Sequence, residues 1–256
     1  MKHKSKLFFL IFLAALTIPS ILGLIHAGFP LTDDGNWMVI RFSAFYEALR
    51  SGQFPVRFLM RLNNGYGYPV ADFLYPLFMY IGVPIHILGF NFVNTIKTIL
   101  ILSVISSSFF SFLWLRKIFD NLSSLIGAVF YILFPYFLFD IYTRGSVGEV
   151  LALSVLPFVL WQIERKSLLL TSIGISALIV AHNTLAFLFI PFIVIYIFIR
   201  NKKITKLNLL TFLFGLGMTS FFWLPAIYDC TILYFQKLKF QMFLLILSII
   251  ILDYLD

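Results

Sequence analysis

The sequence predicts an all-α membrane protein: a bundle of about seven transmembrane helices with a long external loop after the first. Three observations predict this class: 61% of the 256 residues are hydrophobic, only 12% are charged, and the mean hydropathy is +0.99. A water-soluble domain has no interior large enough for so much apolar surface. The apolar residues form runs of about 20 residues, unlike the alternating pattern of a membrane barrel.

The net charge is +8, and the positions of the basic residues indicate how the chain is oriented in a membrane. They predict no nucleic-acid partner. Lys and Arg occur in short clusters between the apolar runs, at 2–6, 116–117, 165–166 and 200–206. A nucleic-acid-binding surface would instead gather them on one polar face. Because cytoplasmic loops of membrane proteins collect Lys and Arg, these clusters predict the cytoplasmic connections of a plasma-membrane protein.

The first apolar run, 7–25, is predicted to be a retained anchor with its N-terminus in the cytoplasm. A cleaved signal peptide has the same basic start, but this run is long enough to span and no small-residue cleavage site precedes Thr32. Six further spans are predicted at 96–115, 122–142, 147–163, 168–181, 184–199 and 207–226.

The segment 73–88 is apolar but is interrupted by Pro76 and Pro84. If it crossed the membrane, every basic cluster after it would face outward, against the rule for Lys and Arg. We therefore predict a helix that lies in the outer interface or dips into it. The stretch 26–94 then becomes one long external loop.

Within this loop, 36–51 has the pattern of an amphipathic helix. The pattern fits a helix on the membrane surface and a helix packed on its own bundle equally well. A turn-rich, aromatic loop follows at 63–69. The apolar face of the helix carries Met38, Phe42, Phe45 and Leu49.

Several acids, one histidine and one arginine fall at predicted external span ends or in the external loop. Such segregation is expected of a site at the outer membrane surface. It is also expected if acids are merely kept out of cytoplasmic loops, so the pattern leaves both interpretations open. The residues are Asp33, Asp34, Asp72, Arg144, Glu149, His182, Asn183 and Asp229.

Most of these motifs also have a structural interpretation. The adjacent acids before the amphipathic helix can cap it, although two exceed what a cap needs. Ser146 and Glu149 have the spacing of a capping box. His182 and Asn183 form either a turn or a ligand contact. Arg144 is not needed for orientation, and a guanidinium suits a phosphate group bidentately.

Several sequence elements occur in an order that resembles one family. They are Thr32-Asp33-Asp34, 49–57 (LRSGQFPVR), 64–69 (NGYGYP), 75–77 (YPL), 142–149 (YTRGSVGE), His182-Asn183 and 221–226 (FFWLPA). Together they resemble prokaryotic membrane proteins of the GT-C glycosyltransferase type, more narrowly the "6-pyruvoyl-tetrahydropterin synthase-related" and YfhO-like group. The likeness runs from about residue 7 to residue 229. It predicts a GT-C-like module at 1–229 and an atypical tail at 230–256.

The resemblance implies a transferase that takes a sugar from a polyprenyl-phosphate donor at the outer face and passes it to an acceptor. Asp34 or Asp33 would be the base that deprotonates the acceptor. Arg144 and Arg57 would neutralise the departing phosphate. The other substrate-binding candidates, two of them tyrosines suited to stacking on sugar rings, are Glu149, His182, Asn183, Tyr66 and Tyr68.

The resemblance implies membrane lipid and lipid-linked sugar as partners and no cofactor beyond this donor substrate. It leaves a divalent cation open. The four histidines are too scattered in the sequence for a zinc-ligand cluster.

The chain departs from the family in two places. Trp37 stands where the group has a histidine after the loop acids, and members of the group are longer. The tail, whose run at 243–252 is too short to span, predicts a truncated or frameshifted and therefore inactive fragment. The alternative function is a non-catalytic multi-pass protein, such as a carrier, a flippase or an assembly subunit. It is favoured by prolines inside the predicted spans, namely Pro19, Pro135, Pro157 and Pro191.

Overall fold

The computed structural model describes residues 2–232, 236–237 and 241, and it divides into two compact units, Met1–Thr219 and Ser220–Asp256. The first unit is a helical bundle. The division precedes the module boundary expected after residue 229. Most of the expected tail 230–256, with the run at 243–252, lies outside the described residues.

All regular secondary structure in the described residues is helical, apart from one isolated bridge between Leu59 and Tyr68. The elements are α1 (Lys2–Thr17), η1 (Ile18–Ser20), α2 (Leu22–Ile25), α3 (Gly35–Arg50), η2 (Asn63–Gly65), α4 (Val70–Phe73), α5 (Leu77–Ile87), α6 (Phe92–Leu115), α7 (Asn121–Leu133), α8 (Pro135–Phe139), η3 (Asp140–Arg144), α9 (Val147–Glu164), α10 (Leu168–Ala181), α11 (Asn183–Asn201) and α12 (Lys206–Met218).

Four helices in the described residues are long and apolar enough to cross a membrane. They are α6, the α7–α8–η3 stretch, α9 and α11, and a fifth results if Lys206–Met218 and Ser220–Ile232 form one span. The prediction of an all-helical fold with several helices that could span a membrane is thus confirmed. Each of the seven predicted runs is helical over most of its length, but α10 has only 14 residues. The count of about seven spans therefore stays a prediction.

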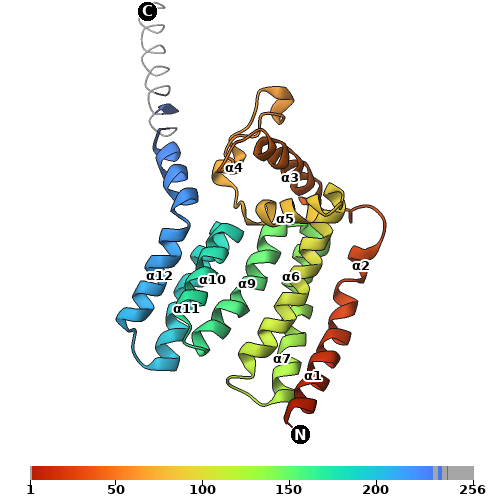
Figure 1. Ribbon diagram of the computed structural model, residues 1–256, viewed down its shortest axis with the longest axis vertical. Helices are drawn as coiled ribbons and strands as arrows, with labels where there is room; N and C mark the ends of the chain where they lie inside the picture. Colours follow the sequence, from red (N-terminus) through yellow and green to blue (C-terminus); the bar gives the residue numbers. More distant parts are fainter. Residues whose placement is uncertain (1, 233–235, 238–240, 242–256) are drawn as a thin grey trace, which may run out of the picture. The chain divides into compact units, whose positions relative to one another are not determined.

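The connections of the bundle gather at two ends of the first unit (Figure 1). The basic end carries the N-terminus and the basic clusters at 116–117, 165–166 and 200–206. The loop end carries the stretch 26–91 between α2 and α6. The structure thus separates the basic clusters from this long loop, as the charge pattern predicts.

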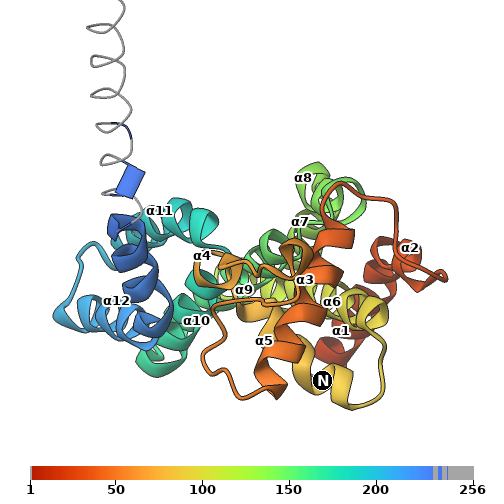
Figure 2. The same cartoon turned by 90° about the horizontal axis from the view of Figure 1, so that it is seen from above.

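At the loop end, α3 and α5 lie across the bundle and pack on its helices (Figures 1 and 2). Helix α5 has only 11 residues, with Pro84 inside it, and is too short to span. The apolar face of α3 is buried, since Met38, Phe42 and Phe45 are at most 2% exposed. Of the two interpretations of the amphipathic pattern, packing on the bundle describes the structure.

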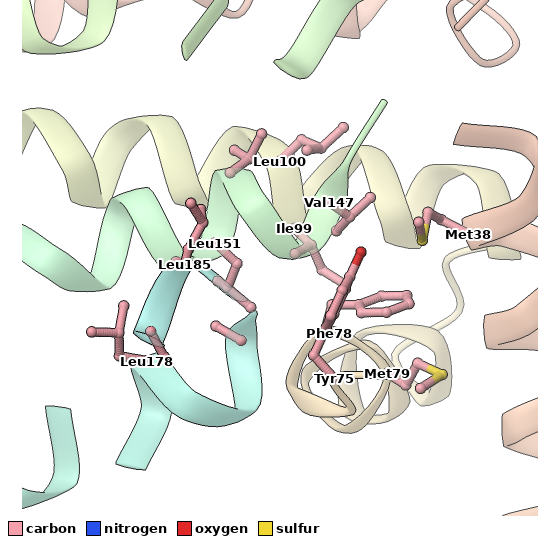
Figure 3. Close-up of a cluster of buried hydrophobic side chains, with 14 of the residues drawn as sticks. Met38, Tyr75, Phe78, Met79, Ile99, Leu100, Val147, Leu151, Leu178 and Leu185 are labelled. Carbon is pink, nitrogen blue, oxygen red and sulfur yellow. The ribbon is translucent and has the colours of Figure 1, made fainter. Parts of the chain in front are cut away.

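A shared apolar core fixes the loop end (Figure 3). It joins Met38 of α3, Phe78 of α5 and Ile99 of α6 to Val147 of α9 and Leu185 of α11. Because these side chains interlock, α5 and the first turn of α9 hold fixed positions relative to the end of α10.

Candidate functional site

A group of polar side chains fills the loop end where η3, the first turn of α9 and the α10–α11 junction meet. Three of them, Asp140, Ser146 and Glu149, are buried, so their hydrogen bonds are shielded from water. We call this group the polar cluster, and it consists of Tyr136, Asp140, Arg144, Ser146, Glu149 and His182.

Arg144 is the centre of the polar cluster. Its two terminal nitrogens reach the two carboxylate oxygens of Glu149 at 2.7 and 2.8 Å, a bidentate pair. One of them also lies 3.2 Å from Oδ1 of Asp140. Two carboxyl groups therefore share one guanidinium, whose side chain is 33% exposed.

Glu149 collects most of the hydrogen bonds in the polar cluster. It is 5% exposed and accepts hydrogen bonds from Tyr136 at 2.5 Å and Ser146 at 3.2 Å. Because Ser146 caps no backbone N–H of α9, the predicted capping box is not formed. Glu149 instead serves as the common acceptor of the polar cluster.

The local sequence explains why these groups meet. Tyr136, Asp140 and Arg144 are four residues apart along α8 and η3, so they project to one side of the helix. Gly145 then ends the helix in the left-handed conformation, with φ of 68°. A Cβ on Gly145 would lie 2.7 Å from the backbone nitrogen of Gly35, so only glycine permits this close approach.

The loop that carries Asp33 and Asp34 is tied to the same turn by its backbone. The N–H of Asp33 donates to the carbonyl of Thr143 at 2.9 Å, and the N–H of Asp34 donates to that of Arg144 at 2.7 Å. Thr32 accepts the N–H of Gly35 at 3.2 Å, while the Asp34 side chain makes no capping bond. Among the described residues, neither carboxylate has a hydrogen bond or an ion pair. Capping therefore does not explain these acids.

His182 joins the polar cluster from the junction of α10 and α11. Its Nδ1 accepts the N–H of Leu185 at 3.2 Å, which caps α11, and its Nε2 lies 3.7 Å from Glu149. Burial lowers the pKa of the imidazole, and the nearby Arg144 acts in the same direction while Glu149 opposes it. A neutral ring that accepts at Nδ1 carries its proton on Nε2, toward Glu149.

Tyr75 closes the polar cluster from the side of α5. Its ring centroid lies 4.5 Å from that of His182, and its hydroxyl lies near the side chain of Ser146. Burial raises the pKa of this hydroxyl, which also lies within electrostatic range of Arg41 and Asp34. Gly148 makes room for the ring, because a Cβ there would lie 2.0 Å from it.

The remaining predicted residues lie elsewhere in the loop end. Arg57 pairs with Asp72 at 3.2 Å. Tyr66 and Tyr68 are 84% and 47% exposed. Asn183 is exposed, and its side chain accepts the N–H of Thr184 at 3.0 Å rather than entering the polar cluster.

An apolar groove of about 650 Å³ runs between α7, α8, α9 and α11. Its walls include Leu156 and Phe189, and toward the polar cluster it includes Tyr136 and Leu185. Tyr136 thus belongs to both features, because its ring lines the groove and its hydroxyl donates to Glu149. The groove fits an apolar chain whose polar end lies at the polar cluster.

Sequence reasoning missed several residues of this site. Asp140 and Tyr136 lie inside a predicted span, where the apolar pattern hides them. The steps of four from Tyr136 to Asp140 and from Asp140 to Arg144 are nevertheless a usable signal. Tyr75 belongs to the motif 75–77, but the sequence predicted no role for its side chain. Arg41, seven residues after Asp34 on α3, is half-buried and has no ion pair in the described part of the chain.

No group of three or more His, Cys, Asp or Glu side chains in the described residues could hold a metal ion. No family model, no curated protein and no solved structure matches the chain.

Proposed function

We propose that this protein is a GT-C-like glycosyltransferase that moves a sugar from a polyprenyl-phosphate donor to an acceptor at the outer face of the plasma membrane. About seven helices then cross the bilayer, with the N-terminus and the basic end in the cytoplasm. One observation carries the proposal: the unpaired carboxylates of Asp33 and Asp34 are tethered to the turn of Arg144, beside a groove suited to a lipid chain.

The donor would divide between the groove and the polar cluster. Its polyprenyl chain is apolar and would occupy the space beside Phe189, with Tyr136 at the polar end. Its phosphate needs positive charge. Because Glu149 and Asp140 already share Arg144, we assign Arg144 to orienting this end of the site and Arg41 to supplying additional positive charge.

The chemistry requires one carboxylate in the base role. Asp34 or Asp33 removes the proton of an acceptor hydroxyl, whose oxygen forms a bond to the anomeric carbon of the sugar. The bond from that carbon to the phosphate oxygen breaks, and polyprenyl phosphate leaves with the electron pair. An unpaired carboxylate suits this role, because it has no partner to give up before accepting the proton.

The test measures consumption of radiolabelled polyprenyl-phosphate sugars by the purified chain in proteoliposomes. Asp33→Asn together with Asp34→Asn keeps the backbone hydrogen bonds and removes the base, so turnover should fall by a factor of about 100 or more. Glu47→Gln, on the same loop and 63% exposed, should leave turnover unchanged. Unchanged turnover in the double variant would reject the two aspartates as the base, and a wild-type chain that consumes none of the sugar donors would reject the transferase itself.

A non-catalytic carrier or flippase is the second candidate, and Asp140 favours it. This acid lies within the candidate span Asn121–Arg144, is fully buried, and has an Oδ2 atom without a partner among the described residues. Ionisable groups inside membrane spans often mark transport or proton pathways. A flippase would move fluorescent polyprenyl phosphate between leaflets without consuming a sugar donor, and Asp140→Asn would slow that movement.

A further inference from the structure

A pocket of about 320 Å³ lies among the helix ends of the basic end, away from the polar cluster. It is formed by the end of α9, the start of α10, the end of α11 and the start of α12, all within the first unit. Lys166, Lys203 and Asn201 line it together with apolar residues such as Leu168 and Ile197. It thus places positive charge beside apolar surface.

The positive charge of this pocket is not neutralised by nearby acids. Glu164 is the only acid between residues 162 and 211. Its two oxygens accept hydrogen bonds from Arg200 at 2.7 and 2.9 Å. Lys166 and Lys203 have no ion pair in the part of the chain that the structure describes. Both ammonium groups are therefore available to an anion.

The backbone holds both lysines in tight turns. Lys166 has a φ of 56°, and its N–H donates to the carbonyl of Ile163 at 2.9 Å. Lys202, next to Lys203, has a φ of 58° and donates its N–H to Phe198 at 2.7 Å. The two side chains therefore start from fixed points on either side of the pocket.

We propose that this pocket binds the phosphate headgroup of an anionic membrane lipid, independently of the proposed transferase function. Basic pockets between helix ends at a membrane surface have the charge and the position for such headgroups. Leu207 lines the pocket and is 57% exposed, so an acyl chain of the lipid would cover it. A free phosphate ion shares the charge but would leave this leucine uncovered.

The test is binding of phosphatidylglycerol to the purified chain by native mass spectrometry, with phosphatidylcholine as the neutral lipid. Lys166→Gln with Lys203→Gln should lower phosphatidylglycerol binding about tenfold or more. Lys202→Gln with Lys206→Gln removes the same charge from side chains that do not line the pocket, and it should preserve binding. Lys166→Arg with Lys203→Arg keeps the charge and should also preserve binding.

Three results would overturn the proposal. Equal losses in the two glutamine pairs would mean diffuse attraction to the surface rather than a site. Inorganic phosphate that raises the melting temperature in lipid-free detergent as much as phosphatidylglycerol does would assign the pocket to a soluble anion. If circular dichroism shows that the double variant is unfolded, the single variants Lys166→Gln and Lys203→Gln are measured instead. Normal phosphatidylglycerol binding by both single variants would reject the site.

Discussion

Two arginine–glutamate pairs, one at each end of the bundle, show how one kind of ion pair serves two purposes. At the basic end, Arg200 and Glu164 pair one guanidinium with one carboxylate at 2.7 Å. Tyr196 also donates to Glu164 and accepts from Trp114 at 2.9 Å, so the group joins α11, α9 and α6. We call these four residues the basic-end clasp. Its charges balance, and its role is structural.

At the loop end, the pair of Arg144 and Glu149 has an additional acid. Asp140 is fully buried, and its Oδ2 has no partner among the described residues. A buried carboxyl group without full hydrogen bonding costs stability, so a purely structural pair would not need it. The basic-end clasp therefore stabilises the fold, whereas the polar cluster has a buried acid that stability does not require and that is expected to serve a ligand.

The largest expected effect comes from removing the shared guanidinium. Arg144→Met leaves two buried carboxyl groups without their cation, which should lower the free energy of unfolding by about 3 kcal/mol. Arg200→Met should cost about 1 kcal/mol, because it leaves one carboxylate without its cation and Glu164 keeps the hydrogen bond from Tyr196. Thermal unfolding in detergent, followed by intrinsic fluorescence, measures both. Equal losses would end the distinction between the two pairs.

A smaller effect is expected from crowding the ring that closes the polar cluster. Gly148→Ala places a Cβ 2.0 Å from the ring of Tyr75, which must move, and this should cost about 2 kcal/mol. Gly217→Ala meets no atom within 4 Å in α12 and should raise stability by up to about 1 kcal/mol, since alanine favours helix. If Gly148→Ala is as stable as Gly217→Ala, the Tyr75 packing does not constrain the site.

The loop end should also respond to pH through His182. Burial lowers its pKa in the folded state below the ordinary value of 6.5, so the unfolded chain takes up this proton first as the pH falls. The stability present above about pH 6.5 should therefore decrease as the pH falls through the folded-state pKa. His182→Gln should flatten the melting temperature between pH 7.5 and 5, although Glu149 and Arg144 still face this position. His26→Gln, at an exposed position outside the polar cluster, should keep the wild-type dependence.

The sequence predicted the helices well and the contacts of the site poorly. Apolar runs of about 20 residues dictate helices in a bilayer, so each predicted run is helical. The charge pattern placed Asp34, Arg144 and His182 at one end, where the structure also has them. It did not reveal that Asp140 shares Arg144, because the apolar pattern of the predicted span hid this acid, although its spacing of four from Arg144 was a usable signal. Nor could spacing show that Asp72 pairs with Arg57, since loop pairing depends on tertiary packing.

The smallest predicted effect on stability separates two aspartates at the starts of two helices. Asp120 accepts the N–H groups of Leu122 and Ser123 at the start of α7, so Asp120→Ala should lower the melting temperature by about 2 °C. Asp34 occupies the corresponding position of α3 but caps nothing, so Asp34→Ala should leave the melting temperature within about 1 °C. The same substitution should lower sugar transfer, whereas Asp120→Ala should not. A loss of stability in Asp34→Ala equal to that in Asp120→Ala would make the acid structural, because a carboxylate that is free to act as a base contributes little to the fold.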